Sequence, residues 1–156
     1  MQLIILIGLQ GAGKSTFYKK NFVDTHIRLN GDMLKTANRE KLLFDACLAS
    51  KTKTVIDKTN PTLADRQKYI PLAKAQHFEV IAYYFDVPFD DALSRNNQRT
   101  GKAKVPEVGL KNVAKHLSKP SFDEGFDKIY FIKNVLNQFI VTEILNEKKD
   151  DPTDLL

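Results

Sequence analysis

The stretch Gly8-Leu9-Gln10-Gly11-Ala12-Gly13-Lys14-Ser15-Thr16 decides the fold of this chain. It fits the pattern G-x-x-x-x-G-K-[ST], in which backbone amides surround a phosphate group. In this pattern the lysine reaches the β- and γ-phosphates, and the hydroxyl group takes a Mg²⁺ site. The apolar residues 3–7 predict a buried parallel strand, and residues 16–22 can begin a helix whose positive end faces the same anion. This order of strand, loop and helix favours a phosphate-binding loop over a chance glycine-rich turn.

The composition predicts a single globular domain. The chain has 156 residues, of which 42% are hydrophobic and 28% are charged. No apolar run approaches the roughly 20 residues that span a bilayer, and the first apolar run lacks the basic lead of a signal peptide. We therefore expect a cytoplasmic protein without a membrane partner. The single cysteine, Cys47, follows Leu42, Leu43 and Ala46 on a predicted buried helix face, which favours a core thiol over a nucleophile.

Positive charge is concentrated in residues 95–119, which hold seven lysines and arginines and one acid, Glu107. A local field of this kind attracts polyphosphate, nucleotide or nucleic acid. The alternative is a solvated lysine-rich helix face, which suits Lys111, Lys115 and Lys119 because they lie at helical spacing. The basic residues before them are not explained in this way.

Strand patterns alternate with helix patterns along the chain. Strands are expected at 2–7, 27–30, 54–56, 78–87, 128–132 and 139–144, and helices are expected after the loop, around Leu42, from Pro61 with Asn60 as the N-cap, after Pro88 and over 106–117. This order predicts an α/β fold with a parallel sheet flanked by helices. We expect the domain to cover residues 1–146, followed by a charged tail over 147–156.

Two acids are expected at the same sheet edge as the phosphate loop, because ligands bind where parallel strands end. Asp32 follows the second strand and is the candidate base that accepts a proton from the phosphoryl acceptor. The alternative for Asp32 is the N-cap of a helix over 33–37. Asp57 ends the third strand and either orders water around Mg²⁺ or pairs with Lys14 or Lys58.

A basic lid is predicted after the fourth strand. Arg95 and Arg99 lie four positions apart, so on a helix they point the same way. Residues 100–104 then read as a flexible basic loop with a glycine hinge, as a lid over a triphosphate requires. The alternative is two ordinary surface arginines, which the phosphate loop elsewhere in the chain makes less favourable.

Several segments resemble the 5′-polynucleotide kinases. Residues 85–88, 95–99 and 105–106 resemble the kinase domain of the T-even phage enzyme. Residues 55–61, with Arg66, Tyr69 and residues 124–126, are similar to the kinase domain of the animal polynucleotide kinase–phosphatases. The likeness covers residues 3–132, and its Thr-Asn-Pro and Asp-Val-Pro segments discriminate far better than the phosphate loop does.

The resemblance implies a P-loop kinase with a nucleoside monophosphate kinase-like fold, which transfers the γ-phosphate of ATP to the 5′-hydroxyl of DNA or RNA. It implies that Lys14 and Ser15 hold the donor phosphates and Mg²⁺, with Ser15 as the metal ligand. Asp32 resembles the general base, Arg99 resembles the lid arginine on the transferring group, and Val105 resembles an apolar residue that packs on the terminal base. The expected nucleotide contacts are Gly8, Gln10, Gly11, Ala12, Gly13, Lys14, Ser15, Thr16, Arg95 and Arg99, and the expected acceptor contacts are Asp32, Lys35, Asp57, Thr59, Asn60, Arg66 and Val105.

Three departures from the family pattern are visible. Lys35 stands where the phage enzyme has an arginine that grips the acceptor phosphate, so the charge is kept but the bidentate fork is lost. Lys58 stands where the phage enzyme has an acid before Thr-Asn. No Asp-x-Asp-Gly-Thr motif follows, so we expect no 3′-phosphatase domain and expect a functional partnership with a separate ligase or phosphatase.

Two other functions remain open on the sequence. A small-molecule kinase that acts on a sugar, antibiotic or nucleoside would use the same loop, base and lid. A third interpretation is a nucleotide-binding interaction module that does not transfer phosphate. The presence of Asp32 and Arg99 at the positions of the family's functional residues argues against it.

Overall fold

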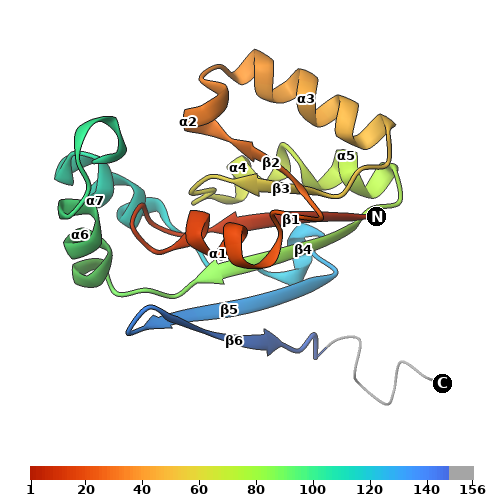
Figure 1. The fold of residues 1–156 in the computed structure, drawn as a ribbon. Helices are drawn as coiled ribbons and strands as arrows, with labels where there is room; N and C mark the ends of the chain where they lie inside the picture. Colours follow the sequence, from red (N-terminus) through yellow and green to blue (C-terminus); the bar gives the residue numbers. More distant parts are fainter. Residues whose placement is uncertain (148–156) are drawn as a thin grey trace.

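The computed structural model describes residues 1–147 and contains one six-stranded sheet in the order β2-β3-β1-β4-β5-β6. The strands are β1 (Gln2–Ile7), β2 (Ile27–Asn30), β3 (Thr54–Asp57), β4 (Glu79–Phe85), β5 (Lys128–Val135) and β6 (Gln138–Ile144). The helices are α1 (Lys14–Asn21), α2 (Gly31–Leu34), α3 (Ala37–Ala49), α4 (Leu63–Gln67), α5 (Ile70–Ala75), α6 (Phe89–Asn97) and α7 (Glu107–His116). Figure 1 shows α6 and α7 at the end of the molecule where the parallel strands finish.

The central strand β1 divides the core into two layers. Leu3, Ile5 and Ile7 pack with side chains of α3 and α5 on one face of the sheet. Ile4 and Leu6 pack on the other face with side chains of α1, α6 and α7. All five side chains are at most 1% exposed. Because a strand covered on both faces needs apolar residues at every position, the unbroken apolar run places β1 in the middle of the sheet.

The predicted parallel sheet is confirmed for β1 to β5, but β6 runs antiparallel to β5. The residues between these two strands, Leu136 and Asn137, have φ values of 51° and 62° and form a tight hairpin turn. A parallel neighbour would need a crossover of a dozen residues or more, which a two-residue connection cannot supply. The predicted strands, 128–132 and 139–144, left six residues between them, and this number was already too small for a crossover.

The helix predicted to start at Pro61, with Asn60 as its N-cap, starts at Leu63 instead. Asn60 has a positive φ of 45°, and its side chain donates a hydrogen bond to the carbonyl of Leu6 at 2.8 Å. Thr62 is the N-cap and forms a reciprocal capping box with Asp65. Because the Thr62 side chain caps the helix N-terminus, the Asn60 side chain is available to hydrogen-bond to Leu6 in β1.

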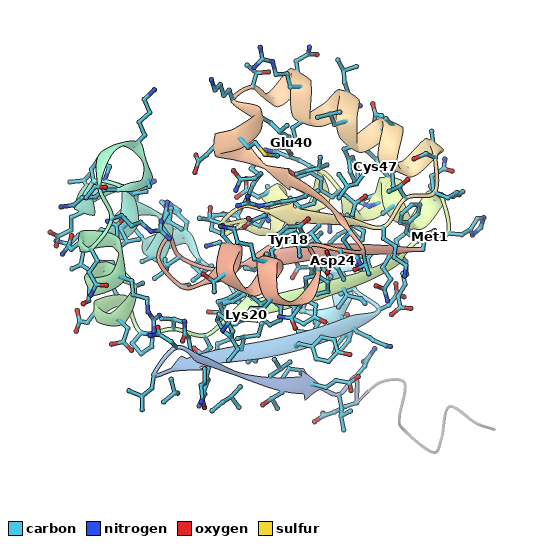
Figure 2. All side chains as sticks on the ribbon, viewed as in Figure 1. Met1, Tyr18, Lys20, Asp24, Glu40 and Cys47 are labelled. Carbon is cyan, nitrogen blue, oxygen red and sulfur yellow. The ribbon has the colours of Figure 1, made fainter. Side chains whose placement is uncertain are left out.

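The buried face predicted for α3 is wrong. Leu42 is 62% exposed and Leu43 is 44% exposed, whereas Phe44, Cys47 and Leu48 face the core. Cys47, labelled in Figure 2, is therefore buried as predicted. The buried face of α3 is the one that contains Phe44, Cys47 and Leu48, and not the predicted face that contains Leu42 and Leu43. Several apolar residues lie close together in this segment, so more than one face satisfies a helical spacing.

No helix in residues 1–147 is long and apolar enough to cross a membrane. The predicted tail over 147–156 lies outside the described residues, apart from Glu147.

Candidate active site

The phosphate loop packs against α6 and against the β5–β6 hairpin. Gly11 and Gly13 have positive φ values of 80° and 104°. A Cβ atom on Gly11 would lie 2.5 Å from the carbonyl oxygen of Ala92 in α6. A Cβ atom on Gly13 would lie 2.9 Å from Nδ2 of Asn134 and 3.0 Å from Cε1 of Phe139. Glycine is therefore required at both positions by conformation and by space.

Lys14 lies at the start of α1 and is only 8% exposed. Its ammonium group donates hydrogen bonds to the carbonyls of Gly8 at 2.8 Å and Leu9 at 2.6 Å. Burial lowers the pKa of Lys14 to about 8, Asp57 opposes this shift, and the nearby charge of Arg99 adds to it. The residue therefore holds a positive charge at neutral pH inside the loop that surrounds it.

Ser15 and Asp57 converge beside Lys14. The Ser15 hydroxyl donates to Oδ2 of Asp57 at 3.0 Å. A hydroxyl and a carboxylate are hard oxygen donors, which suit Mg²⁺ that is also held by substrate phosphates. Asp57 does not pair with Lys14 or Lys58 at salt-bridge distance, since its ion pair is with Arg28 at 2.7 Å.

Arg28 is a residue of this site that the sequence interpretation missed. Its Nε donates to Asp57 Oδ2 at 2.7 Å, and its Nη2 donates to the Ser15 hydroxyl at 2.9 Å. Its position on β2 beside the buried Leu29 was the available signal, because alternate residues of a strand face opposite sides. The guanidinium group orients both oxygens that could hold Mg²⁺.

Asp32 is free of the capping role that was its alternative. The N-cap of α2 is Asn30, whose side chain accepts a hydrogen bond from the amide of Met33 at 2.9 Å. The helix ends at Leu34, and Lys35 leaves it with a φ of 72°. The Asp32 carboxylate is exposed and lines the same cavity as Lys14 and Ser15.

This reaction cavity has a volume of about 260 Å³ and gathers most of the predicted site. Of the predicted residues, it is lined by Gln10, Gly11, Lys14, Ser15, Asp32, Asp57, Thr59, Arg99 and Val105. Asn30, Gly31 and Lys58 line it as well and were not among the predicted contacts. Residues far apart in the sequence are therefore brought together where β1, β2 and β3 end.

The two lid arginines do not share a helix face. Helix α6 ends at Asn97, so Arg99 lies beyond it, and its Nη1 donates to the carbonyl of Ala103 at 3.4 Å. Arg95 turns toward the β5–β6 hairpin and donates to the carbonyl of Asn134 at 3.4 Å. The Arg95 Nη1 is buried without a hydrogen-bond partner among the described residues, which fits its predicted contact with nucleotide.

Asn96 holds the lid segment in place and was also missed by the sequence interpretation. It is fully buried, its Nδ2 donates to the carbonyl of Val105 at 2.6 Å, and its Oδ1 accepts from the Val105 amide at 2.9 Å. These two bonds fix Val105 at the wall of the reaction cavity. A signal was present, since Asn96 lies one helical turn after the buried Ala92.

Three predicted acceptor contacts do not line the reaction cavity. Lys35 is exposed outside it, and Asn60 is buried against the sheet. Arg66 is 1% exposed and pairs with Glu124, and it also donates to the carbonyls of Asn60, Pro61 and Ser118. The structure thus places Arg66 in the frame of the domain.

Two further amides of the phosphate loop donate hydrogen bonds within the protein. The Gly8 amide donates to the carbonyl of Thr59 at 3.0 Å, and the Ala12 amide donates to that of Leu9 at 3.2 Å. Thr16 lies exposed in the first turn of α1. The Thr-Asn-Pro segment, residues 59–61, is therefore hydrogen-bonded to the first residue of the phosphate loop and to the strand before it.

The fold and the phosphate loop define this protein as a P-loop kinase. Residues 3–120 match the model of a family described as an AAA domain, and the chain belongs to that family.

Two curated relatives carry bifunctional names. A putative bifunctional polynucleotide phosphatase/kinase of Acanthamoeba polyphaga mimivirus is 32% identical, over 87% of this chain and 35% of the relative. The bifunctional polynucleotide phosphatase/kinase of Schizosaccharomyces pombe is 27% identical, over 82% of this chain and 32% of the relative. The chain thus spans about a third of the length of these relatives.

Solved structures share the fold at low sequence identity. Chaetomium thermophilum Kti12 in complex with ADP-AlF3 superposes with a TM-score of 0.60 at 15% identity, covering 84% of this chain and 88% of Kti12. A gluconokinase from Sinorhizobium meliloti 1021 superposes with a TM-score of 0.58 at 16% identity, covering 85% of this chain and 82% of the gluconokinase.

Proposed function

We propose that this protein transfers the γ-phosphate of ATP to the 5′-hydroxyl of a DNA or RNA strand. The observation that carries the proposal is that Lys14, Asp32, Arg99 and Val105 line one cavity. A phosphate cradle, a free carboxylate, a lid cation and an apolar wall are the parts that phosphoryl transfer to a nucleoside hydroxyl needs.

Each residue has a defined task in this reaction. The loop amides and Lys14 hold the β- and γ-phosphates, and Ser15 with Asp57 presents oxygens toward Mg²⁺, which would neutralise developing phosphate charge when bound. Asp32 accepts the proton of the 5′-hydroxyl. The hydroxyl oxygen forms a bond to the γ-phosphorus, and the bond from that phosphorus to the ADP oxygen breaks. Arg99 lies where it can stabilise negative charge on the transferring group.

Two observations support a polynucleotide as the acceptor. The relatives in mimivirus and Schizosaccharomyces pombe are named polynucleotide phosphatase/kinases, and this chain aligns with about a third of each. Residues 95–119 supply a concentration of positive charge next to the lid. Lys35 remains a predicted contact for an acceptor phosphate. A 5′-phosphorylated end is a substrate for ligation, so we propose a separate ligase as a functional partner.

A small-molecule kinase is the second candidate. A cavity of about 260 Å³ is large enough for a sugar or nucleoside, and the fold neighbour from Sinorhizobium meliloti is a gluconokinase. The two candidates differ only in the acceptor, so acceptor chemistry separates them.

The test measures transfer of labelled phosphate from ATP to a 5′-hydroxyl oligonucleotide, a free nucleoside and gluconate, with the wild-type protein and Asp32→Asn. We expect the oligonucleotide to be the best acceptor. Asp32→Asn should lower kcat about 10²–10⁴-fold, since it removes the proton acceptor. ATP affinity and thermal stability should stay unchanged, because Asn30 provides the cap.

The matched control is Asp24→Asn, an exposed acid on the connection before β2, which should keep wild-type activity. Preferred phosphorylation of gluconate or of the nucleoside would reject the polynucleotide acceptor. An Asp32→Asn variant that keeps its rate and loses stability would show that Asp32 has a structural role.

A further inference from the structure

A chain of connected hollows leads away from the reaction cavity. A second hollow of about 210 Å³ shares Lys58 and Thr59 with the reaction cavity. A third hollow of about 370 Å³ lies between α3 and α5 and shares Lys58, Lys68 and Tyr69 with the second. Lys58 lines all three. The shared residues place the three hollows next to one another in a row, which we call the path, and we call the third hollow the α3–α5 cavity.

We propose that the α3–α5 cavity binds the nucleobase of the second nucleotide of a single-stranded acceptor, and that Lys58 holds the phosphate between the first and second nucleotides. This inference rests on the proposed polynucleotide function. It adds a subsite of defined chemistry to the reaction cavity.

The lining of the α3–α5 cavity suits a flat heteroaromatic base. Phe44 and Tyr69 are 3% exposed and form its interior, while Ala37 and the half-exposed Leu72 lie at its surface. Aromatic and apolar surfaces bind bases of any sequence, since every base has a π-face. The cavity thus offers affinity without sequence selection.

Lys58 is held where a phosphate would pass between the two cavities. Its ammonium group donates to Glu40 Oε2 at 3.1 Å and to the Tyr69 hydroxyl at 3.4 Å. The Tyr69 hydroxyl in turn donates to Glu40 Oε1, so the buried carboxylate is paired on both oxygens. An ammonium group has three donors, and two are used here, which leaves one for a phosphate oxygen. Glu40 lies in the first turn of α3 (Figure 2).

The rim of the α3–α5 cavity carries two lysines that a nucleic-acid backbone could contact. Lys41 and Lys68 lie on it, each in an exposed ion pair with an acid on its own helix or turn, Asp45 and Asp65. Exposed pairs of this kind are weak and leave the lysines able to face a phosphate. The Glu40 carboxylate is compensated by Lys58 and Tyr69, so it does not repel the backbone.

The geometry requires a single-stranded end. A base can enter the cavity only after it leaves its stack and its pairing partner, which costs more in a duplex than in a free strand. We therefore expect a 5′-overhang or single strand to be a better acceptor than a blunt duplex.

The test compares three acceptors with the wild-type protein: a nucleoside 3′-monophosphate, a 5′-hydroxyl dinucleotide, and the same dinucleotide with an abasic second position. We expect the abasic dinucleotide to have a KM about fivefold or more above that of the intact dinucleotide, the lower end of the usual effect of stacking one base. The nucleoside 3′-monophosphate should resemble the abasic compound, because both keep the phosphate and lack the second base.

Variants separate the contribution of the second base to acceptor KM from the contribution of the phosphate. Leu72→Ala should raise KM for the intact dinucleotide and leave KM for the abasic one unchanged, whereas Leu63→Ala, at a similarly exposed position outside the path, should change neither. Lys58→Gln should raise KM for all three acceptors, because each carries the phosphate. Its control is Lys74→Gln, which removes an ion-paired lysine of α5 far from the path.

A binding measurement without turnover completes the test. An oligonucleotide with 2-aminopurine at the second position should change its fluorescence when the wild-type protein is added, and the change should shrink with Leu72→Ala. The same probe at the fifth position should respond little. Equal KM values for intact and abasic dinucleotides, with oligonucleotides still phosphorylated, would overturn the subsite alone. Phosphorylation of gluconate but of no oligonucleotide would overturn the proposed function and the subsite together.

Discussion

Two arginines predicted to meet substrate have opposite surroundings. Arg66, in the segment after β3, forms a two-point ion pair with Glu124 at 2.6 and 3.2 Å and donates to three carbonyls. Arg99, in the lid after α6, is exposed and makes one long hydrogen bond to the carbonyl of Ala103. Both lie in segments that resemble the same kinase family.

The difference shows how the structure separates a framework arginine from a substrate arginine. The donors of Arg66 are used within the protein, and they join the segment after β3 to the connection between α7 and β5. Arg99 lines the reaction cavity and uses only its Nη1 in a hydrogen bond to another described residue, so its other donors are available. Arginine therefore has a structural role at Arg66 and a proposed substrate-binding role at Arg99. The difference lies in how many of its hydrogen-bond donors are already used within the protein.

The largest effect is expected from Arg99→Ala. The change removes the lid cation that we propose to stabilise the transferring group, and arginines in this role are worth about 10³–10⁵-fold in kcat. Thermal stability should not change, because the side chain is exposed. Steady-state kinetics and a melting curve measure both, with Lys102→Ala in the same lid as the control. A stable variant with wild-type kcat would remove Arg99 from the catalytic residues.

Arg66→Ala should act on stability instead. Removing one partner of a buried pair leaves Glu124 buried and uncompensated, which costs about 3–5 kcal/mol in the free energy of unfolding. Urea denaturation measures the loss, and Arg66→Lys should recover only part of it because the fork is missing. Variants that remain folded should keep the wild-type acceptor KM. A raised KM at full stability would instead place Arg66 in contact with the acceptor.

Lys14 combines the two situations, since it is buried like Arg66 and faces the cavity like Arg99. Its pKa is lowered to about 8, so the ammonium group of the nucleotide-free protein loses its proton as pH rises through 8. ADP affinity should then weaken by up to about tenfold for each pH unit above 8, since only the charged form attracts the phosphates. Calorimetry at pH 7 to 9.5 measures this, and Lys14→Gln should show no such slope. A flat profile for the wild-type protein would contradict the assignment.

The smallest effect is expected at the base of the lid. Asn96→Ala removes both hydrogen bonds that fix Val105, so acceptor KM should rise severalfold, in line with about 1 kcal/mol for a net hydrogen bond. The exposed neighbour Asn97→Ala should leave KM unchanged. Equal values for the two variants would show that Val105 needs no fixed position.

Much of the fold follows from local sequence patterns. The limits of β1 and β2 were predicted correctly, because a continuous apolar run and a glycine turn mark them. The start of α4 was missed because Asn60 and Thr62 are both good caps, and only the contact of Asn60 with Leu6 decides between them. The direction of β6 was missed because the alternation of strands and helices was extended over the short connection predicted between 132 and 139, which in the structure has only two residues.

The candidate site was predictable where a motif fixes the residue type. Asp32 and Asp57, which were predicted from their place after strand ends, line one cavity with part of the phosphate loop. Arg99 and Val105, which the lid pattern and the family resemblance predicted, line the same cavity. Arg28, Asn96 and Lys58 act through partners far away in the sequence, so spacing alone does not reveal them. Arg66 shows the reverse case, since a partner 58 positions away turns a predicted contact into a framework residue.

The packing of the β5–β6 hairpin against the phosphate loop has a consequence for biosynthesis. The loop leaves the ribosome long before two of its partners, Asn134, which donates to the carbonyl of Ala12 from 122 positions away, and Phe139, which packs beside Gly13. Contacts between such distant residues form late, because the intervening chain must be ordered first. We therefore expect a nascent chain to acquire ATP affinity only after the β5–β6 hairpin has been synthesised.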